Sequence, residues 1–227
     1  MPIIGKETDA WAALQNGQKS RFVRALHFFH FRPNQLARSW KREEVITWEL
    51  LAALQILPRA FFLGDLLKRI ALRAPDVKEI CSSLLHGLHT IEIEEYPSLE
   101  LLGKFRNRKS DIGFRLYDSP RLWLEAKTIS VTPTTLLPQL ADQKAALKSL
   151  CAGKPHAVIA LLPQSQTSID WPTIHWKSVV ASLDFCIKSL EATDINYSRG
   201  YIEIAKELKN RIYSHPEKIN NETTIVI

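Results

Sequence analysis

Two neighbouring stretches decide the fold of this chain: Asp111-Ile112-Gly113-Phe114-Arg115-Leu116-Tyr117, and Arg121 to Thr128 shortly after it. In both stretches apolar residues alternate with polar ones, which is the period of a strand with one buried face. The segment between them, Asp118-Ser119-Pro120, has the composition of a turn. The buried sides would consist of Ile112, Phe114 and Leu116 in the first strand and of Leu122, Leu124 and Ala126 in the second. Together the stretches predict a β-hairpin.

The regions on either side of the hairpin predict further elements. Upstream, the apolar patterns and prolines favour helices over 43–57, 61–73 and 75–88, and the alternation after His89 favours a strand over 90–95. Downstream we expect a helix over 136–150, a fully apolar strand over 157–162, and helices over 174–190 and 197–213. The order of helices, three strands, helix, strand and helices indicates an α/β protein with a mixed sheet.

The composition is that of an ordinary globular protein. Of 227 residues, 45% are hydrophobic and 24% charged, and no apolar run approaches the roughly 18 residues that span a bilayer. The N-terminus lacks the basic and then apolar layout of a signal peptide. The three cysteines (Cys81, Cys151 and Cys186) are scattered, without metal-ligand spacing. We therefore expect a cytoplasmic protein with reduced thiols and no membrane segment.

Basic residues are distributed unevenly along the chain. There are 30 Lys and Arg against 24 Asp and Glu, and the stretch from Lys19 to Arg42 holds seven basic residues, five aromatics and no acid. Basic side chains bind phosphates and aromatics stack on unpaired bases. The candidate nucleic-acid-binding residues are Arg32, Arg38, Arg42, Lys104, Arg106, Arg108 and Lys109. The alternative is that the phenylalanines belong to the core and the arginines to an ordinary solvated face.

The group Glu125-Ala126-Lys127 carries the candidate chemistry. Residues i and i+2 of a strand point to the same side, so the acid and the lysine would project together. A hairpin that keeps both apolar sides aligned around its turn would place Asp111 opposite Lys127 and Gly113 opposite Glu125. Asp111 and Glu125 would then be diagonal neighbours, about 7–8 Å apart between α-carbons, a spacing at which two carboxylates can share one Mg²⁺.

These residues resemble the PD-(D/E)XK nuclease superfamily: Ser110-Asp111, a short hairpin, then Glu125-Ala126-Lys127, with Ser110 in the place of proline. The family's core of a helix, three strands, a helix and a strand matches the predicted order over 43–163. The resemblance implies a restriction-endonuclease-like fold and hydrolysis of phosphodiester bonds. Asp111, Glu125 and the Ala126 carbonyl would hold Mg²⁺, with Mn²⁺ as a substitute, and Lys127 would act on the attacking water or the transition state.

The resemblance also implies two supporting residues. Many members carry Gln-x-x-x-Tyr on the helix after the lysine strand, and here Gln139 keeps the glutamine while Gln143 replaces the tyrosine. Members often have a glutamate on the first core helix, for which Glu43 is the first choice, with Glu44 and Glu49 as rivals. Ile174-His175-Trp176-Lys177 resembles a peripheral annex of some members and has no assigned chemistry.

The resulting interpretation is a Mg²⁺-dependent nuclease with DNA as the expected substrate. It comprises a basic, aromatic-rich helical region (1–42), a nuclease core (43–163) and a helical annex (164–227), together one compact domain. A dimer would suit the cutting of two strands. One alternative is a catalytically weak module that binds nucleic acid or protein on the same fold, and another is a helical adaptor with a scaffolding sheet. The charged residues could instead form a solvated ion-pair face of Asp111, Arg115, Arg121, Glu125 and Lys127.

Overall fold

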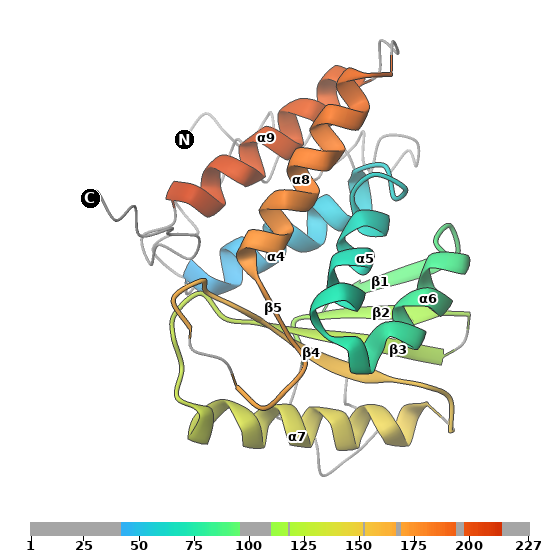
Figure 1. Cartoon of the computed structure of the whole chain (residues 1–227), viewed down its shortest axis with the longest axis vertical. Helices are drawn as coiled ribbons and strands as arrows, with labels where there is room; N and C mark the ends of the chain where they lie inside the picture. The colour runs from blue at the N-terminus through green and yellow to red at the C-terminus, as the bar shows by residue number, and fades with distance from the viewer. Residues whose placement is uncertain are drawn as a thin grey trace, which may run out of the picture.

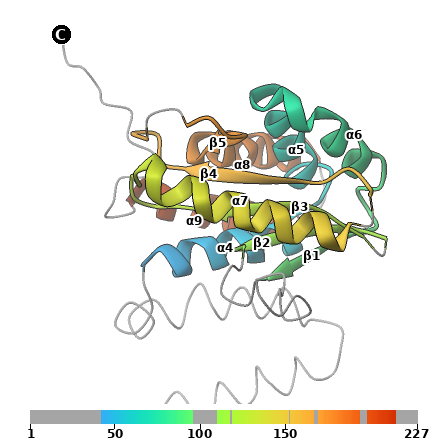
Figure 2. The ribbon, with the colours of Figure 1, turned by 90° about the horizontal axis from the view of Figure 1, so that it is seen from below.

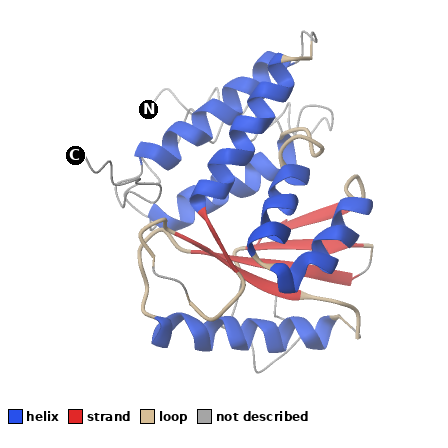
Figure 3. Ribbon diagram, in the orientation of Figure 1, coloured by secondary structure: helices blue, strands red, loops and turns tan. Residues whose placement is uncertain are grey.

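A computed structural model of the chain describes residues 42–95, 110–117, 119–151, 153–166, 169–193 and 198–214. The secondary structure along these ranges is drawn in Figure 3. Six of the candidate nucleic-acid-binding residues lie outside the described residues, namely Arg32, Arg38, Lys104, Arg106, Arg108 and Lys109.

The sheet has five strands whose spatial order follows the chain. Strands β1 (Ile91–Glu95), β2 (Ile112–Leu116) and β3 (Ser119–Ala126) are antiparallel neighbours. Strands β4 (Ala157–Leu162) and β5 (Thr173–His175) continue the sheet parallel to β3. The predicted α/β class and mixed sheet are therefore confirmed.

Six α-helices in the described ranges cover the two faces of the sheet unequally (Figure 1). Helix α7 (Pro133–Leu150) lies alone across one face, over β3 and β4, as the view in Figure 2 shows. The opposite face carries a larger core built with the other helices. These are α4 (Arg42–Ile56), α5 (Leu63–Arg73), α6 (Lys78–His86), α8 (Trp176–Glu191) and α9 (Ser198–Ser214), with a 3₁₀ turn at Pro75–Val77 before α6.

Alternate side chains of β3 pack into the cores on the two faces of the sheet. Leu122, Leu124 and Ala126 enter the larger core, whereas Trp123 packs beneath α7. Both faces of this strand are therefore buried, because the parallel β3–α7–β4 connection brings α7 back over the sheet. The side of β3 that the alternation suggested to be exposed to solvent is therefore covered by α7.

Several elements differ from the predictions. The helix predicted over 75–88 divides into the 3₁₀ turn and α6, and β3 begins at Ser119, within the predicted turn. Helix α7 begins at Pro133, three residues before the predicted start, because proline suits a first helical position; Pro138 then lies inside the helix. Strand β5 was missed, since 174–190 was predicted as helix throughout. Ile174 instead pairs with Leu161 of β4 and is buried at 1% exposure. A three-residue strand has too little pattern of its own to be recognised.

The predicted hairpin register is wrong by two residues. Ile112 pairs with Leu124 and Gly113 with Trp123, so Gly113 does not face Glu125. Nearer the turn the register shifts, and Arg115 pairs with Pro120. The irregularity coincides with a proline, which has no N–H for the ladder and is found at bulges and edges. A two-residue change keeps every side chain on its predicted face, which is why the alternation could not reveal it.

None of the helices among the described residues is long and apolar enough to cross a membrane. The cysteines are free and buried, as the scattered spacing predicted. Burial raises the pKa of the Cys81 and Cys186 thiols to about 12 and that of Cys151 to about 11. These thiols therefore remain protonated at neutral pH.

Candidate active site

Glu125 lies at the end of β3 and is buried at 2% exposure. Three donors reach its two carboxylate oxygens. Oε1 accepts from Gln139 Nε2 at 2.5 Å and lies 2.7 Å from Lys127 Nζ, while Oε2 accepts from Gln143 Nε2 at 2.6 Å. A buried carboxylate is costly unless it is paired and hydrogen-bonded, and this one is both. The site is therefore organised around Glu125.

The two glutamines come from one face of α7. Residues i and i+4 of a helix lie on the same side, and this side of α7 also carries Leu136, Leu140 and Leu147 of the smaller core. The structure thus brings the predicted Gln139 to Glu125. It also brings Gln143, whose role the sequence left open because tyrosine was expected there. The available signal was its i+4 spacing from Gln139 on the apolar face.

Lys127 follows β3 directly and is held by its backbone as well as its side chain. Its N–H donates to the Leu161 carbonyl of β4 at 2.8 Å, and its own carbonyl accepts from the Trp176 indole N–H at 2.8 Å. The side chain is 15% exposed, with its ammonium beside Glu125. The predicted projection of Glu125 and Lys127 to a common side is therefore confirmed.

Asp111 joins the site through the hairpin. Its Oδ2 accepts from the backbone N–H of Ala126 at 2.7 Å, and the buried Ser110 hydroxyl donates to the Leu124 carbonyl at 2.9 Å. Ser110 and Asp111 are thereby fastened to β3 just beyond the Ile112–Leu124 pair. Asp111 therefore contacts Ala126 and does not lie opposite Lys127, as the predicted register required.

The donor chemistry of this group fits a hard divalent cation with few protein ligands. The described residues contain no group of three or more His, Cys, Asp or Glu side chains that could hold a metal ion. Two carboxylates and a backbone carbonyl remain, and Mg²⁺ usually binds through one or two carboxylates and keeps several waters. A carboxylate has about four acceptor positions, of which Glu125 uses three. Asp111, Glu125 and the Ala126 carbonyl could therefore supply the oxygen ligands.

The alternative of a single solvated ion-pair face receives no support from the contacts. Arg115 pairs with Glu94 of β1 at 2.7 Å, and Glu92 lies at 4.0 Å. Arg121, near the other end of β3, directs its guanidinium to the Pro155 carbonyl at 3.4 Å. Each arginine thus has partners other than Asp111, Glu125 and Lys127, which form a group of their own.

The helix glutamates are placed differently from one another. Glu43 and Glu44 lie in the first turn of α4, and their side chains are outside the described part of the structure, as is that of Arg42. Glu49 is buried at 2% exposure and pairs with Arg211 of α9 at 2.8 Å. The pKa of Glu49 is raised to about 7, chiefly by burial; Arg211 opposes this rise and Glu207 adds to it. Glu49 therefore joins α4 to α9, and Glu43 stays the predicted site glutamate.

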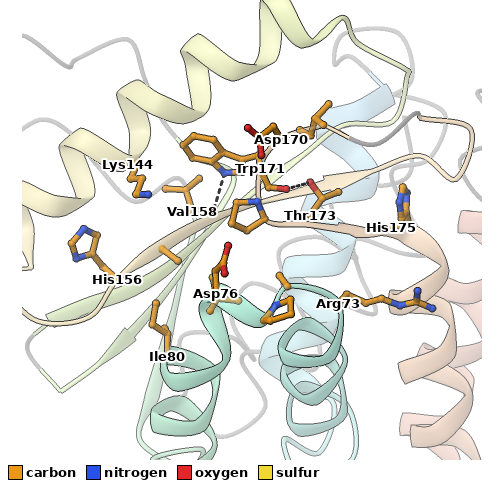
Figure 4. A pocket seen from close by; sticks show the side chains of 16 residues that line it. Arg73, Asp76, Ile80, Lys144, His156, Val158, Asp170, Trp171, Thr173 and His175 are labelled. Atoms are coloured by element: carbon orange, nitrogen blue, oxygen red, sulfur yellow. Dashed lines mark hydrogen bonds between the residues drawn. The ribbon is translucent and has the colours of Figure 1, made fainter.

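A cavity of about 700 Å³ lies elsewhere, between the 3₁₀ turn before α6, the start of β4 and the segment before β5 (Figure 4). Its lining includes Asp76, Lys144 and Trp171, and includes neither Glu125 nor Lys127. The Trp171 indole donates to the Val158 carbonyl at 2.9 Å, and the Lys144 ammonium lies 5.5 Å from the ring centroid. Trp171 is thus already held against β4 by its indole N–H.

Comparisons of the chain with protein-family models, curated proteins and solved structures find no match.

Proposed function

We propose that this protein is a Mg²⁺-dependent nuclease, with a restriction-endonuclease-like fold, that hydrolyses phosphodiester bonds of nucleic acid, DNA being the expected substrate. The observation that carries the proposal is the convergence of Asp111, Glu125 and Lys127 at the end of β3, with Gln139 supplied by α7. A strand-borne pair of carboxylates beside an ammonium is a composition suited to phosphoryl transfer.

The arrangement of the elements supports the same proposal. Helix α4 precedes three antiparallel strands, and α7 then leads to β4, which pairs parallel with β3. This is the order implied by the family resemblance. It brings the end of β3 and one face of α7 together, so that residues from both contribute to one site.

Each residue has a distinct proposed role. Asp111, Glu125 and the Ala126 carbonyl hold the cation, which when bound supplies Lewis-acid stabilisation and a water of lowered pKa. Lys127 places its ammonium against the attacking water or the developing phosphate charge. Gln139 and Gln143 fix the two oxygens of Glu125, so the carboxylate cannot rotate away from the cation. Glu43 and the basic residues of 1–42 and 104–109 are proposed to contact a second cation and the phosphate backbone, respectively.

A second candidate function follows from the same contacts. All three donors to Glu125 are side chains of the protein. A hydrogen-bond network in which every member has a partner can stabilise the fold without any catalytic role. The protein would then be a module that binds nucleic acid or a protein partner without cutting. The two candidates make opposite predictions about divalent cations.

The deciding experiment compares cleavage and binding in the same samples. The wild-type chain is incubated with end-labelled single-stranded DNA, double-stranded DNA and RNA, in Mg²⁺, in Mn²⁺ and in excess chelator. The nuclease predicts products in Mg²⁺ and Mn²⁺ and none in chelator, with binding retained in all three. Glu125→Gln is the matched control, because it keeps the size of the side chain. Binding without products in any cation would support the module, and products in chelator would refute the proposed chemistry.

The same binding assay tests the proposed basic surface. Each phosphate contact contributes about one unit to the slope of log affinity against log salt. Replacing Arg32, Arg38 and Arg42 together with glutamine should therefore weaken binding and flatten that slope without changing the cleavage of bound substrate. An unchanged slope would place the binding surface elsewhere.

A further inference from the structure

Two consecutive residues at the junction of β5 and α8, His175 and Trp176, bind backbone carbonyls at the ends of two neighbouring parallel strands. Trp176 Nε1 donates to the carbonyl of Lys127, directly after β3, at 2.8 Å. His175 Nδ1 lies 3.0 Å from the carbonyl of Pro163, directly after β4. A carbonyl oxygen only accepts, so the proton of this second bond lies on Nδ1. Both carbonyls stand just past the last residues of their strands.

The position of this pair is determined by the sheet itself. His175 ends β5 and pairs with Leu162 of β4. This pairing fixes the backbone at the point where α8 begins with Trp176. Trp176 is fully buried and belongs to the larger core, on the face of the sheet opposite to α7. Its indole N–H is therefore removed from water, and losing its acceptor would leave a buried donor without a partner, at a cost of about 1–3 kcal/mol.

From this geometry we infer that Trp176 is a positioning residue of the proposed nuclease site and acts through Lys127. The inference rests on the proposed function. With its N–H on Leu161 and its carbonyl on Trp176, the backbone of Lys127 is held on two sides. The ammonium can then stay beside Glu125 although lysine has a long and flexible stem. The helical segment after β4 thereby becomes a part of the site, not a peripheral addition.

The chain offers a matched control in Trp171. Its indole N–H makes the same kind of bond, to the carbonyl of Val158 in β4 at 2.9 Å (Figure 4), and the cavity that it lines does not include Lys127. Phenylalanine at either position removes one indole N–H and keeps an aromatic ring. A purely structural effect would lower the stability of both variants, whereas an effect through Lys127 would be confined to Trp176→Phe.

The test measures cleavage and local order on the same proteins. We expect Trp176→Phe to lower kcat for Mg²⁺-dependent cleavage by about 10-fold to 100-fold with KM unchanged, because a misplacement of about 1 Å in a reacting group has effects of this size. Trp171→Phe should keep the wild-type kcat. Hydrogen exchange at the amides of residues 127–130 should become faster in Trp176→Phe and stay unchanged in Trp171→Phe.

Each result decides the inference. Equal kcat and equal exchange in the two variants would overturn it. If Trp176→Phe does not fold, β-(3-benzothienyl)alanine at position 176 replaces only the N–H by sulfur, and the same comparison applies. If the wild-type chain cuts nothing, the proposed function fails separately. The exchange measurement then still decides whether Trp176 orders Lys127, and unchanged exchange would overturn that as well.

Discussion

Gln143 donates its amide N–H to Oε2 of Glu125 across 2.6 Å, with both side chains removed from water. This contact joins α7 to β3 and leaves neither oxygen of Glu125 without a donor, since Gln139 and Lys127 occupy the other. The amide of glutamine and the hydroxyl of tyrosine can both donate a hydrogen bond to a carboxylate. Glutamine at position 143 therefore supplies a hydrogen-bond donor where the resemblance led us to expect tyrosine.

Replacing Gln143 with leucine should destabilise the protein more than the same change at Gln139. Gln143 donates the hydrogen bond to Oε2 of Glu125, whereas Oε1 retains Lys127 when Gln139 is lost. Leaving a buried acceptor unsatisfied costs about 1–3 kcal/mol. Urea denaturation of Gln143→Leu and Gln139→Leu measures the difference. Equal stability of the two variants would show that water or a rearranged side chain replaces the lost donor.

Asp111→Asn should separate the structural role of this residue from its proposed role as a ligand. The amide oxygen of asparagine can still accept from the Ala126 N–H, so the free energy of unfolding should change by only about 0.5 kcal/mol. Cation binding should weaken because a charged ligand is lost. Calorimetric titration with Mn²⁺ measures the binding. Asp111→Ala, which also loses the hydrogen bond, should be less stable than Asp111→Asn; full cleavage activity of either variant would contradict the proposal.

Lys127→Met should abolish the chemical step while Mn²⁺ binding persists. Methionine keeps an unbranched apolar stem and removes the ammonium, and loss of a group that acts directly on the proton or charge of a reaction typically costs about 100-fold or more. Single-turnover cleavage measures the effect. Arginine should not rescue it, because guanidinium is wider and stays protonated. Lys144→Met is the control, since this lysine lies on the cavity side of α7 near Trp171.

The burial of the Glu49 carboxylate should make the stability of the protein depend on pH. The pKa of Glu49 is about 7 in the folded state, above its ordinary value of 4.5, because burial disfavours the charge. The folded state therefore binds more protons than the unfolded state between these values, and the free energy of unfolding falls as pH rises through them. The total loss should be about 3 kcal/mol.

Urea denaturation from about pH 4 to about pH 8 tests this dependence. Glu49→Gln cannot titrate, so the stability of the wild type relative to this variant should decline across the window. Glu207→Gln removes a carboxylate that raises the pKa of Glu49, so it should move the decline to lower pH. A constant difference between the wild type and Glu49→Gln would show that Glu49 does not titrate there.

The sequence by itself determined the class of the fold and most of its elements. Alternation in 112–116 and 122–126 is a property of the chain, because side chains of a strand change face at every residue. The apolar run 157–162 likewise favoured a strand buried on both faces, and β4 confirms it. The same local rule placed Glu125 and Lys127 on one side, which was enough to nominate the candidate site.

Tertiary structure alone decided the register and the surroundings of that site. Alternation has a period of two and cannot distinguish registers that differ by two residues, so the approach of Asp111 to Ala126 depended on how β2 and β3 pair near Pro120. Strand β5 forms because its backbone pairs with that of β4. The donors Gln143 and Trp176 reach Glu125 and Lys127 from segments 18 and 49 residues away. Contacts over such separations arise from packing between elements, which no local pattern encodes.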